Sequence, residues 1–514
     1  MPIRFQVDDR QVEVEDDGRT LLDVLREDLG VRSAKDGCSP QGQCGCCTVL
    51  VDGSPRVACV TPARRLSGRT VTTIDGLPGP IRQEWAAAFC ATGASQCGFC
   101  TPGIIMRLAA LGERAADRAA VETGLLAHLC RCTGWQTIVE AAGQVANGGG
   151  RAAGRDLAAA TQRATLEGGV HQRVAPDVAL GQGGFADDLA PAGALVAVPD
   201  GRGGWATGET LAEARAAARK VPGRRSGSTL RYPLELPPGS WAVTLRTTWV
   251  EPGYLETDAS WCVPGGDPAS PLANGGAFGG KQASVAPAAA RALADQSGRP
   301  VRVVLAREDA VRLGHKRPPM AAGVRADGTG MVRVVRTPGW ADAFRSVAPG
   351  IEIEEIDVPG PPTSAAVRAA GWAEAAILRA AVAAGECRTV TVERAGARAT
   401  AVVDHGAICI RVACGAPLDE VVLRSYCIGA AHMALGWVTS EGIAVGDDGV
   451  PDDLTIRSFG ILRAKDMLPV EVAIEPGSGP PVRGSDAVFA AVAAAVWIDQ
   501  GLSPEWPTNK RRWS

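Results

Sequence analysis

The sequence has no strong excess of charge of either sign. Its 53 lysines and arginines nearly balance 56 aspartates and glutamates, which gives a formal net charge of −3. A chain that binds nucleic acid or an anionic membrane through its charge carries a clear basic excess. The composition therefore predicts no nucleic acid partner and no membrane partner.

Long apolar runs are also missing. The alanine-rich stretches are interrupted by charges or glycine, so no segment predicts a membrane span. The first 18 residues (MPIRFQVDDRQVEVEDDG) lack the apolar core of a secretory signal. No fixed-period repeat and no long run of like charges is present. We therefore expect a soluble, cytoplasmic protein.

Histidine is scarce, and its spacing does not suggest a metal site. The chain has five: His128, His171, His315, His405 and His432. None has the spacing of metal ligands, and His432 lies in an apolar helical segment. We expect His432 to be a core residue.

Cysteine, by contrast, is abundant and clustered. Ten of the 15 cysteines lie in residues 38–132. A cytosolic chain rarely uses cysteine for disulfides, so this cluster predicts metal ligands or redox groups. The other five have apolar neighbours, and we expect them to be small buried hydrophobic residues. They are Cys262, Cys387, Cys409, Cys414 and Cys427.

The N-terminal part changes character near residue 76. Residues 1–76 contain an alternating hairpin pattern, a helix pattern that Thr20 can cap and Gly30 can close, and two further strand patterns. This predicts a small mixed β-fold with one helix. Residues 77–146 contain four helical runs separated by Gly, Pro and Thr, which predicts a small helical bundle.

The rest of the chain is less distinct. Residues 147–157 are glycine-rich and predict a linker. Residues 158–514 alternate strand and helix patterns, and the Pro/Gly-rich stretch 348–363 is a candidate internal boundary.

The first cysteine set is GCSPQGQCGCCTVLVDGSPRVAC. Its candidate ligands are Cys38, Cys44, Cys47 and Cys59. A [2Fe-2S] cluster needs four thiolates, and a glycine-rich loop can wrap closely around it, as in plant-type ferredoxins. The alternatives are a structural zinc site, which usually has paired Cys-x2–4-Cys knuckles, and ordinary buried cysteines. Cys46 lies between two ligands, so we expect it to point away or to be a spare.

The second cysteine set is QCGFCTPG with LCRCTGW. Its candidate ligands are Cys97, Cys100, Cys130 and Cys132. Each pair lies beside Gly or Thr at a predicted helix start, where free N–H groups favour an anionic cluster. A thioredoxin-like Cys-x-x-Cys site is the alternative, but it would leave Cys130 and Cys132 unexplained. We expect Cys90 to be core packing.

These motifs, in this order, resemble the molybdenum hydroxylases (xanthine dehydrogenase, aldehyde oxidase and carbon monoxide dehydrogenase). The resemblance covers residues 1–146. It implies a multidomain α+β fold. An N-terminal β-grasp ferredoxin-like domain (1–76) precedes a four-helix [2Fe-2S] domain (77–146). By the same resemblance, the second cluster lies nearer molybdopterin, Gln96 and Cys132 approach that cofactor, and the first cluster lies nearer a flavin.

Residues 158–514 resemble a shortened mixed α/β molybdopterin-binding region. The matching stretches are GQGGFADDLAPAGALVAV, EPGYLETDASW, NGGAFGGKQ, RAAGWAEA, RSYCIGAAHMALGWVTSEGI and RAKDMLPVEVAIE. The resemblance implies that the glycine loop binds the cofactor and that Arg368 helps hold the substrate. The loop residues are Gly275, Gly276, Phe278, Gly279 and Gly280.

The resemblance also locates the family's catalytic base. That glutamate lies in a Gly-x-Gly-Glu segment, and here the segment is PVRGSDAVF. Ser485 falls at the glutamate position, and Asp486 is adjacent. A serine is not a base near neutral pH without help, whereas Asp486 can serve if the register slips by one residue.

We expect an electron-transfer component of a molybdenum hydroxylase. Two [2Fe-2S] clusters would pass electrons from a molybdopterin centre to FAD on a partner subunit, because this chain shows no flavin-binding region. The expected assembly is a hetero-oligomer with an FAD-binding subunit and, in one version, a separate molybdenum-binding subunit. Two alternatives stay open: a self-sufficient hydroxylase of an N-heterocycle or aldehyde, and an iron–sulfur redox sensor.

Overall fold

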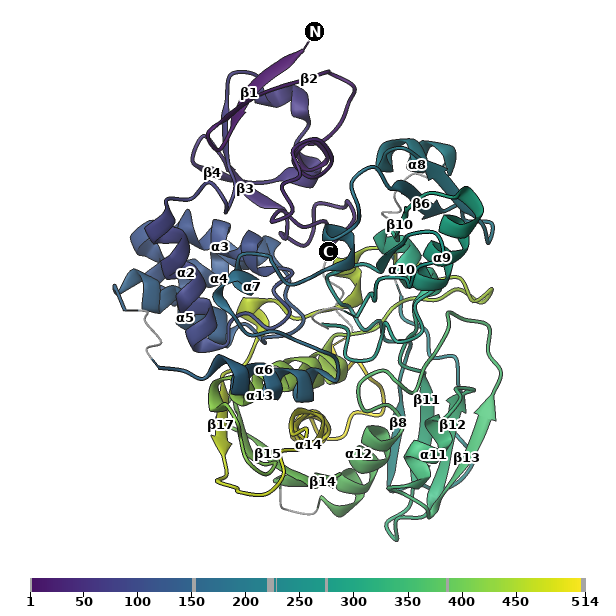
Figure 1. Cartoon of the computed structure of the whole chain (residues 1–514). Helices are drawn as coiled ribbons and strands as arrows, with labels where there is room; N and C mark the ends of the chain where they lie inside the picture. The colour runs from purple at the N-terminus through teal and green to yellow at the C-terminus, as the bar shows by residue number, and fades with distance from the viewer. Residues whose placement is uncertain are drawn as a thin grey trace.

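The computed structural model in Figure 1 describes residues 2–149, 154–219, 226–227, 229–272, 276–384 and 388–509. The chain starts in a small β-domain at the top of the view and continues into a helical bundle at the left. Three further sheets and their helices make up the remainder.

The first domain is a five-stranded sheet in the order β2-β1-β5-β3-β4. The strands are β1 (Ile3–Val7), β2 (Arg10–Val14), β3 (Thr48–Val51), β4 (Ser54–Val57) and β5 (Thr70–Thr72). The expected hairpin is β1 with β2, and β1 also pairs in parallel with β5. The long cysteine-bearing loop lies between η1 (Val24–Asp28) and β3.

The predicted helix after Thr20 is present but irregular. Thr20 Oγ1 accepts a hydrogen bond from Asp23 N–H at 3.3 Å, as a capping residue does. One α-helical turn, α1 (Leu21–Asp23), continues as the π-helical segment η1 (Val24–Asp28). Two 3-10 turns, η2 (Ala58–Val60) and η3 (Ala63–Leu66), follow β4.

The predicted helical bundle is confirmed. Its helices are α2 (Gly79–Thr92), α3 (Thr101–Ala109), α4 (Arg118–Gly124) and α5 (Gln136–Ala146), with 3-10 turns η4 (Gly112–Ala116) and η5 (Leu125–Ala127). After residue 153 the chain continues through α6 (Leu157–Gly168), α7 (Pro176–Ala179) and η6 (Ala186–Asp188).

The first C-terminal sheet has the order β7-β6-β10-β9. Its strands are β6 (Leu195–Pro199), β7 (Trp205–Gly208), β9 (Ala259–Cys262) and β10 (Val301–Val304), with helices α8 (Leu211–Ala217), α9 (Ala286–Ser297) and α10 (Arg307–Leu313). The second sheet has the order β13-β12-β11-β8. Its elements are β8 (Val243–Arg246), β11 (Met320–Val324), β12 (Gly330–Val335), β13 (Ile351–Ile356) and α11 (Trp340–Arg345).

The third sheet has the order β14-β15-β16-β17. Its elements are β14 (Val390–Arg394), β15 (Ala397–Asp404), β16 (Ala407–Ala413) and β17 (Val470–Ile474), with helices α12 (Trp372–Ala383), α13 (Glu420–Thr439) and α14 (Ser485–Asp499) and 3-10 turns η7 (Ile456–Phe459) and η8 (Ala464–Asp466). The candidate boundary 348–363 contains β13, which pairs along its whole length with β12. The chain therefore leaves the second sheet only after residue 356.

Helix α13 is the central helix of the C-terminal region. Among the described residues it alone is long and apolar enough to cross a membrane, and 89% of its most apolar window is buried in the protein. It packs against α14 and carries His432, which is fully buried as expected. In α13 the apolar length reflects a core position.

Most of the isolated cysteines are buried as predicted. Cys90, Cys262, Cys414 and Cys427 are buried, with at most 8% of their surface exposed. Cys409 departs from the prediction, because on β16 it is only half-buried. Cys387 lies outside the described residues.

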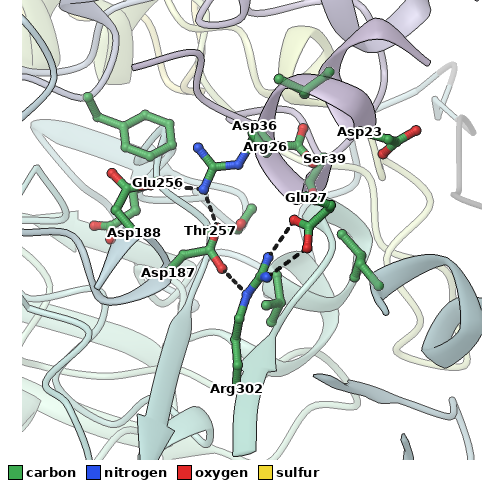
Figure 2. A pocket seen from close by; sticks show the side chains of 14 residues that line it. Asp23, Arg26, Glu27, Asp36, Ser39, Asp187, Asp188, Glu256, Thr257 and Arg302 are labelled. Carbon is green, nitrogen blue, oxygen red and sulfur yellow. Dashed lines mark hydrogen bonds and ion pairs between the residues drawn. The ribbon is translucent and has the colours of Figure 1, made fainter. Parts of the chain in front are cut away.

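A buried network of charges joins the first domain to the C-terminal region (Figure 2). Arg26 on η1 donates to Asp187 and Asp188 at 2.7 and 2.8 Å. Arg302 on β10 donates to Asp187 at 2.6 Å and to Glu27 at 3.0 Å. Burial alone would raise the pKa of Asp187, but the charges of Arg302 and Arg26 outweigh it and lower that pKa. The network fixes the position of the first domain against the first C-terminal sheet.

Candidate metal centres and their junction with the C-terminal region

Three cysteines of the first set lie in the loop before β3, and the fourth, Cys59, lies in η2 after β4. Cys38, Cys44, Cys47 and Cys59 are each at most 3% exposed. Backbone N–H groups point at the sulfurs: Gln41 donates to Cys38 at 3.2 Å, and Cys59 donates to Cys47 at 3.4 Å. Such donors stabilise thiolates and a negatively charged cluster.

The second set lies where two helices begin. Cys100 directly precedes α3, and Cys132 lies four residues before α5. The sulfurs of Cys97 and Cys132 are 3.6 Å apart, and Thr133 Oγ1 lies 3.2 Å from Cys130 Sγ. All four cysteines are buried, so the predicted convergence of the two pairs is present in the structure.

The thiols of each set contact one another. In the second set Cys97 pairs with Cys132 and Cys100 with Cys130; in the first, Cys38 contacts Cys44 and Cys59, and Cys59 also contacts Cys47. Among the described residues no group of three or more His, Cys, Asp or Glu side chains is arranged to hold a single metal ion. A [2Fe-2S] cluster divides its four thiolates between two irons, so the two thiol pairs of the second set fit it better than they fit tetrahedral zinc.

Contacts between the thiols also make their pKa values unequal. Hydrogen bonding from Cys44 and Cys59 lowers the pKa of Cys38 well below its usual value. Hydrogen bonding from Cys100 lowers the pKa of Cys130 to about 6. Each set therefore contains a thiol that readily gives up its proton, as metal binding requires.

The two sets are joined through the backbone. Leu129, next to Cys130, donates its N–H to the carbonyl of Cys44 at 3.0 Å. Close packing there depends on Gly103, because a Cβ at that position would lie 2.3 Å from the Gly45 carbonyl. His128 Nε2 lies 3.1 Å from Thr48 Oγ1, and burial lowers the pKa of His128 to about 3.

The second set also contacts the C-terminal region. A Cβ at Gly276 would lie 3.4 Å from Cys97 Sγ and 3.5 Å from Cys132 Sγ. A Cβ at Gly429 on α13 would lie 1.8 Å from the Cys132 carbonyl. Glycine at these two positions lets the C-terminal backbone approach the second set directly. Gly275 lies outside the described residues.

Gln96 leaves one polar atom unsatisfied at this junction. Its Nε2 donates to the Cys132 carbonyl at 3.1 Å and to Ser425 Oγ at 3.0 Å. Its Oε1 is buried and has no hydrogen-bond partner in the described part of the chain. A buried acceptor without a donor is costly, so this atom fits a ligand that donates a hydrogen bond.

The rest of the glycine loop is held by close backbone contacts. Phe278 and Gly279 both have positive φ, 45° and 91°. A Cβ at Gly279 would lie 1.7 Å from the Ala366 carbonyl, and the Phe278 carbonyl accepts the Arg368 N–H at 2.8 Å. A Cβ at Gly280 would lie 2.8 Å from Pro252.

The two candidate catalytic residues bind each other. Arg368 Nε donates to Asp486 Oδ1 at 3.0 Å, and its guanidinium lies 4.5 Å from the centre of the Phe278 ring. The other oxygen of Asp486 accepts from Arg483 at 3.1 Å. Both oxygens of Asp486 are therefore occupied by guanidinium groups.

Ser485 has a neighbour that the sequence did not reveal. Glu167, at the end of α6, accepts hydrogen bonds from the N–H groups of Ser485 and Gly484 at 2.9 and 3.0 Å. Arg163 also donates to Glu167, at 3.1 Å. A carboxylate at the N-terminus of α14 is stabilised there, but no local motif marks Glu167, because α6 and α14 are more than 300 residues apart.

Three family models match the chain. The model described as "2Fe-2S iron-sulfur cluster binding domain" matches residues 5–67, and "[2Fe-2S] binding domain" matches residues 73–143. "Molybdopterin cofactor-binding domain" matches residues 271–343, which include the glycine loop.

Curated relatives match the N-terminal part. The nicotinate dehydrogenase small FeS subunit of Eubacterium barkeri is 40% identical over 132 residues, which are 24% of this chain and 81% of that subunit. The xanthine dehydrogenase iron-sulfur-binding subunit of Escherichia coli O157:H7 is 40% identical over 127 residues, 24% of this chain and 79% of that subunit.

A solved structure matches the fold of the whole chain. Aldehyde oxidoreductase from Desulfovibrio gigas superimposes with a TM-score of 0.68 at 16% identity, covering 96% of this chain and 97% of that one. This likeness supports the predicted order of ferredoxin-like domains followed by a molybdenum-binding type of region. With two cluster-binding matches, a molybdopterin-binding match and these relatives, the chain belongs to the molybdenum hydroxylase family and is an oxidoreductase of that type.

Proposed function

We propose that this chain carries single electrons between a molybdopterin centre and a flavin on a partner subunit. The observation that carries the proposal is the continuous contact from the Gly276 loop to the second cysteine set and on to the first. In this proposal Cys97, Cys100, Cys130 and Cys132 bind one [2Fe-2S] cluster, and Cys38, Cys44, Cys47 and Cys59 bind the other.

The direction of the route follows from what surrounds each set. The second set is enclosed between the helical bundle and α13, beside the molybdopterin-binding match. The first set lies nearer the surface, since Val60, next to Cys59, is 45% exposed. Electrons therefore enter at the second cluster and leave at the first.

The junction residues fit a polar cofactor. Gln96 offers its unsatisfied Oε1, and Gly276, Phe278, Gly279 and Gly280 form the loop that would hold molybdopterin, together with Gly275. When bound, molybdopterin would hold a molybdenum ion, which would supply two-electron redox chemistry toward a substrate. The role of this chain's cysteines is to take those electrons away one at a time.

The partner is proposed to be an FAD-binding subunit. Two relatives are named as the small FeS subunit and the iron-sulfur-binding subunit of dehydrogenases, and a third as the small subunit of nicotine 6-hydroxylase, which supports a hetero-oligomer. In one version a separate molybdenum-binding subunit completes the assembly, and the C-terminal region of this chain is catalytically degenerate. The engagement of Asp486 by Arg368 and Arg483, with serine at position 485, supports that version.

The second candidate function is a self-sufficient hydroxylase of an N-heterocycle or aldehyde. The molybdopterin-binding match and the unsatisfied Gln96 Oε1 favour it. It requires that Asp486 be released from its two arginines, or that another group act as the base. Substrate-dependent reduction of the isolated, molybdenum-loaded chain would establish this candidate.

Electron paramagnetic resonance tests the electron-carrier proposal. The fully reduced, anaerobically purified chain should give two distinct signals, one for each cluster. Because the two sets are joined through Leu129 and Cys44, the signals should broaden each other at low temperature. A single signal, or two signals without mutual broadening, would contradict the proposal.

A further inference from the structure

The first cysteine set contains a fifth buried thiol. The run CGCC places Cys46 between the assigned ligands Cys44 and Cys47. Cys46 is 1% exposed, so it does not point toward solvent. The proposed electron route gives it no role.

Cys46 and Cys44 direct their sulfurs to the same space. A Cβ built on Gly37 would lie 3.0 Å from Cys46 Sγ and 3.1 Å from Cys44 Sγ. The two thiols also lie within hydrogen-bonding reach of each other. Glycine at position 37 leaves this space open, and any larger residue would fill it.

The backbone around the two thiols is fixed on both sides. The Cys44 carbonyl accepts the Leu129 N–H at 3.0 Å, and the Cys46 carbonyl accepts the Lys35 N–H at 3.3 Å. Thr48 N–H donates to the Gly45 carbonyl between them at 3.1 Å. Because these hydrogen bonds hold the backbone, rotation of the Cys46 side chain is the movement that would bring its sulfur toward the Cys44 position.

We propose that Cys46 is a reserve ligand of the first cluster and takes the place of Cys44 at the iron. The inference rests on the proposed assignment of the first cluster. In the exchange the iron–sulfur bond to Cys44 breaks and one to Cys46 forms. The proton of the Cys46 thiol passes to the released Cys44 thiolate, so no electron is transferred and the cluster charge is unchanged.

The test compares Cys44→Ala, Cys46→Ala and the double variant, each purified without oxygen. Cys44→Ala and Cys46→Ala should each keep about four irons per chain and both resonance signals. The double variant should lose the first signal and fall to about two irons. If Cys44→Ala loses the first cluster as completely as the double variant does, or if Cys46→Ala alone loses it, Cys46 is not a reserve ligand.

If Cys44→Ala does not fold, it loses the second signal as well as the first. A serine variant then provides the test. In Cys44→Ser, replacement by Cys46 leaves a spectrum of four-thiolate type, whereas ligation by the introduced hydroxyl oxygen changes the visible absorption. A changed spectrum would overturn the inference. Failure of the proposed function is distinguishable, because it would already show as a missing first cluster in the unmodified chain.

Discussion

At the scale of single residues, the sulfur of Cys97 lies 3.6 Å from that of Cys132 and 3.4 Å from the point that a Cβ of Gly276 would occupy. Cys97→Ser should abolish or strongly alter the second cluster's resonance signal and leave the first unchanged, because the first set does not include Cys97. Cys262→Ser is the control: Cys262 is also buried but belongs to neither set, so this variant should keep both signals. Two unchanged signals in Cys97→Ser would mean that Cys97 is not a ligand.

His432 gives a prediction about pH. It is fully buried, its Nε2 lies 3.0 Å from the Leu462 carbonyl, and burial, with a contribution from Arg131, lowers its pKa to about 4. In the unfolded chain this histidine takes up a proton near pH 6.5. The contribution of His432 to the free energy of unfolding is therefore fully present above that pH and falls as the pH drops toward 4.

Equilibrium unfolding at several pH values measures this effect. His432→Gln should reduce the slope of unfolding free energy against pH between about 6.5 and about 4 by up to about 1.4 kcal/mol per pH unit. His405→Gln, at an exposed position, should leave the slope as it is. An unchanged slope in His432→Gln would show that His432 is already charged in the folded protein.

The residue scale also separates what the sequence could predict from what it could not. The candidate ligands were predictable because most of them lie in short, closely spaced motifs. The contacts between motifs, such as that of Cys97 with Cys132, join residues 35 positions apart and depend on packing. The pairing of Arg368 with Asp486, and the contact of Glu167 with Ser485, join residues 118 and 318 positions apart. Only the packing of α6, α14 and the glycine loop brings them together, and local pattern does not encode that packing.

At the scale of elements, α13 approaches the second set only because residue 429 is glycine. A Cβ there would lie 1.8 Å from the Cys132 carbonyl, a backbone atom that cannot rotate away. Gly429→Ala should therefore cost about 3 kcal/mol and weaken the second cluster's signal before the first.

Gly143→Ala is the control for that prediction. Gly143 lies inside α5, and no atom lies within 4 Å of the point that its Cβ would occupy. This substitution should be neutral or stabilise the protein by up to about 1 kcal/mol, because alanine favours helix. Thermal unfolding followed at the visible absorption of the clusters measures both variants. Equal stability of the two would contradict the close contact between α13 and Cys132.

The charge network of Figure 2 is a second contact between elements. Asp187 accepts hydrogen bonds from both Arg26 and Arg302. Asp187→Asn should therefore lower the free energy of unfolding by about 2–3 kcal/mol, because two largely buried guanidinium groups would lose a negatively charged partner. Since the folded pKa of Asp187 is lowered, its contribution is present near neutral pH and is lost as the pH falls below about 4.

Limited proteolysis of the first domain and thermal unfolding measure this effect. The control is Asp342→Asn, whose carboxylate is 89% exposed beside Arg345 and should change stability by less than about 0.5 kcal/mol. If Asp187→Asn behaves like the control, the network does not hold the first domain in place.

Elements with strong local signals were the predictable ones. The hairpin and the four helices of the bundle followed from alternation, caps and glycine breaks. The helix after Thr20 was predicted, but its largely π-helical form was not. That segment carries Arg26 and Glu27, which both bind the C-terminal region. Local periodicity contains no information about these long-range contacts.

At the scale of the whole molecule, the parts contact one another in the order that the proposed electron route requires. The C-terminal region contacts the second cysteine set, and the second set contacts the first. The motifs predicted this order, but the distribution of three sheets over residues 158–514 needed the structure. Strands β6, β10 and β11 are short and almost completely buried, so their patterns do not show which sheet they join.

The most direct test of the central claim is the iron and molybdenum content of the full chain, purified without oxygen and without partners. The account predicts about four irons per chain, from two clusters of two. Four irons with stoichiometric molybdenum would favour the self-sufficient hydroxylase, and four irons without molybdenum would favour the electron-transfer subunit. Iron near zero, with zinc in its place, would contradict the account.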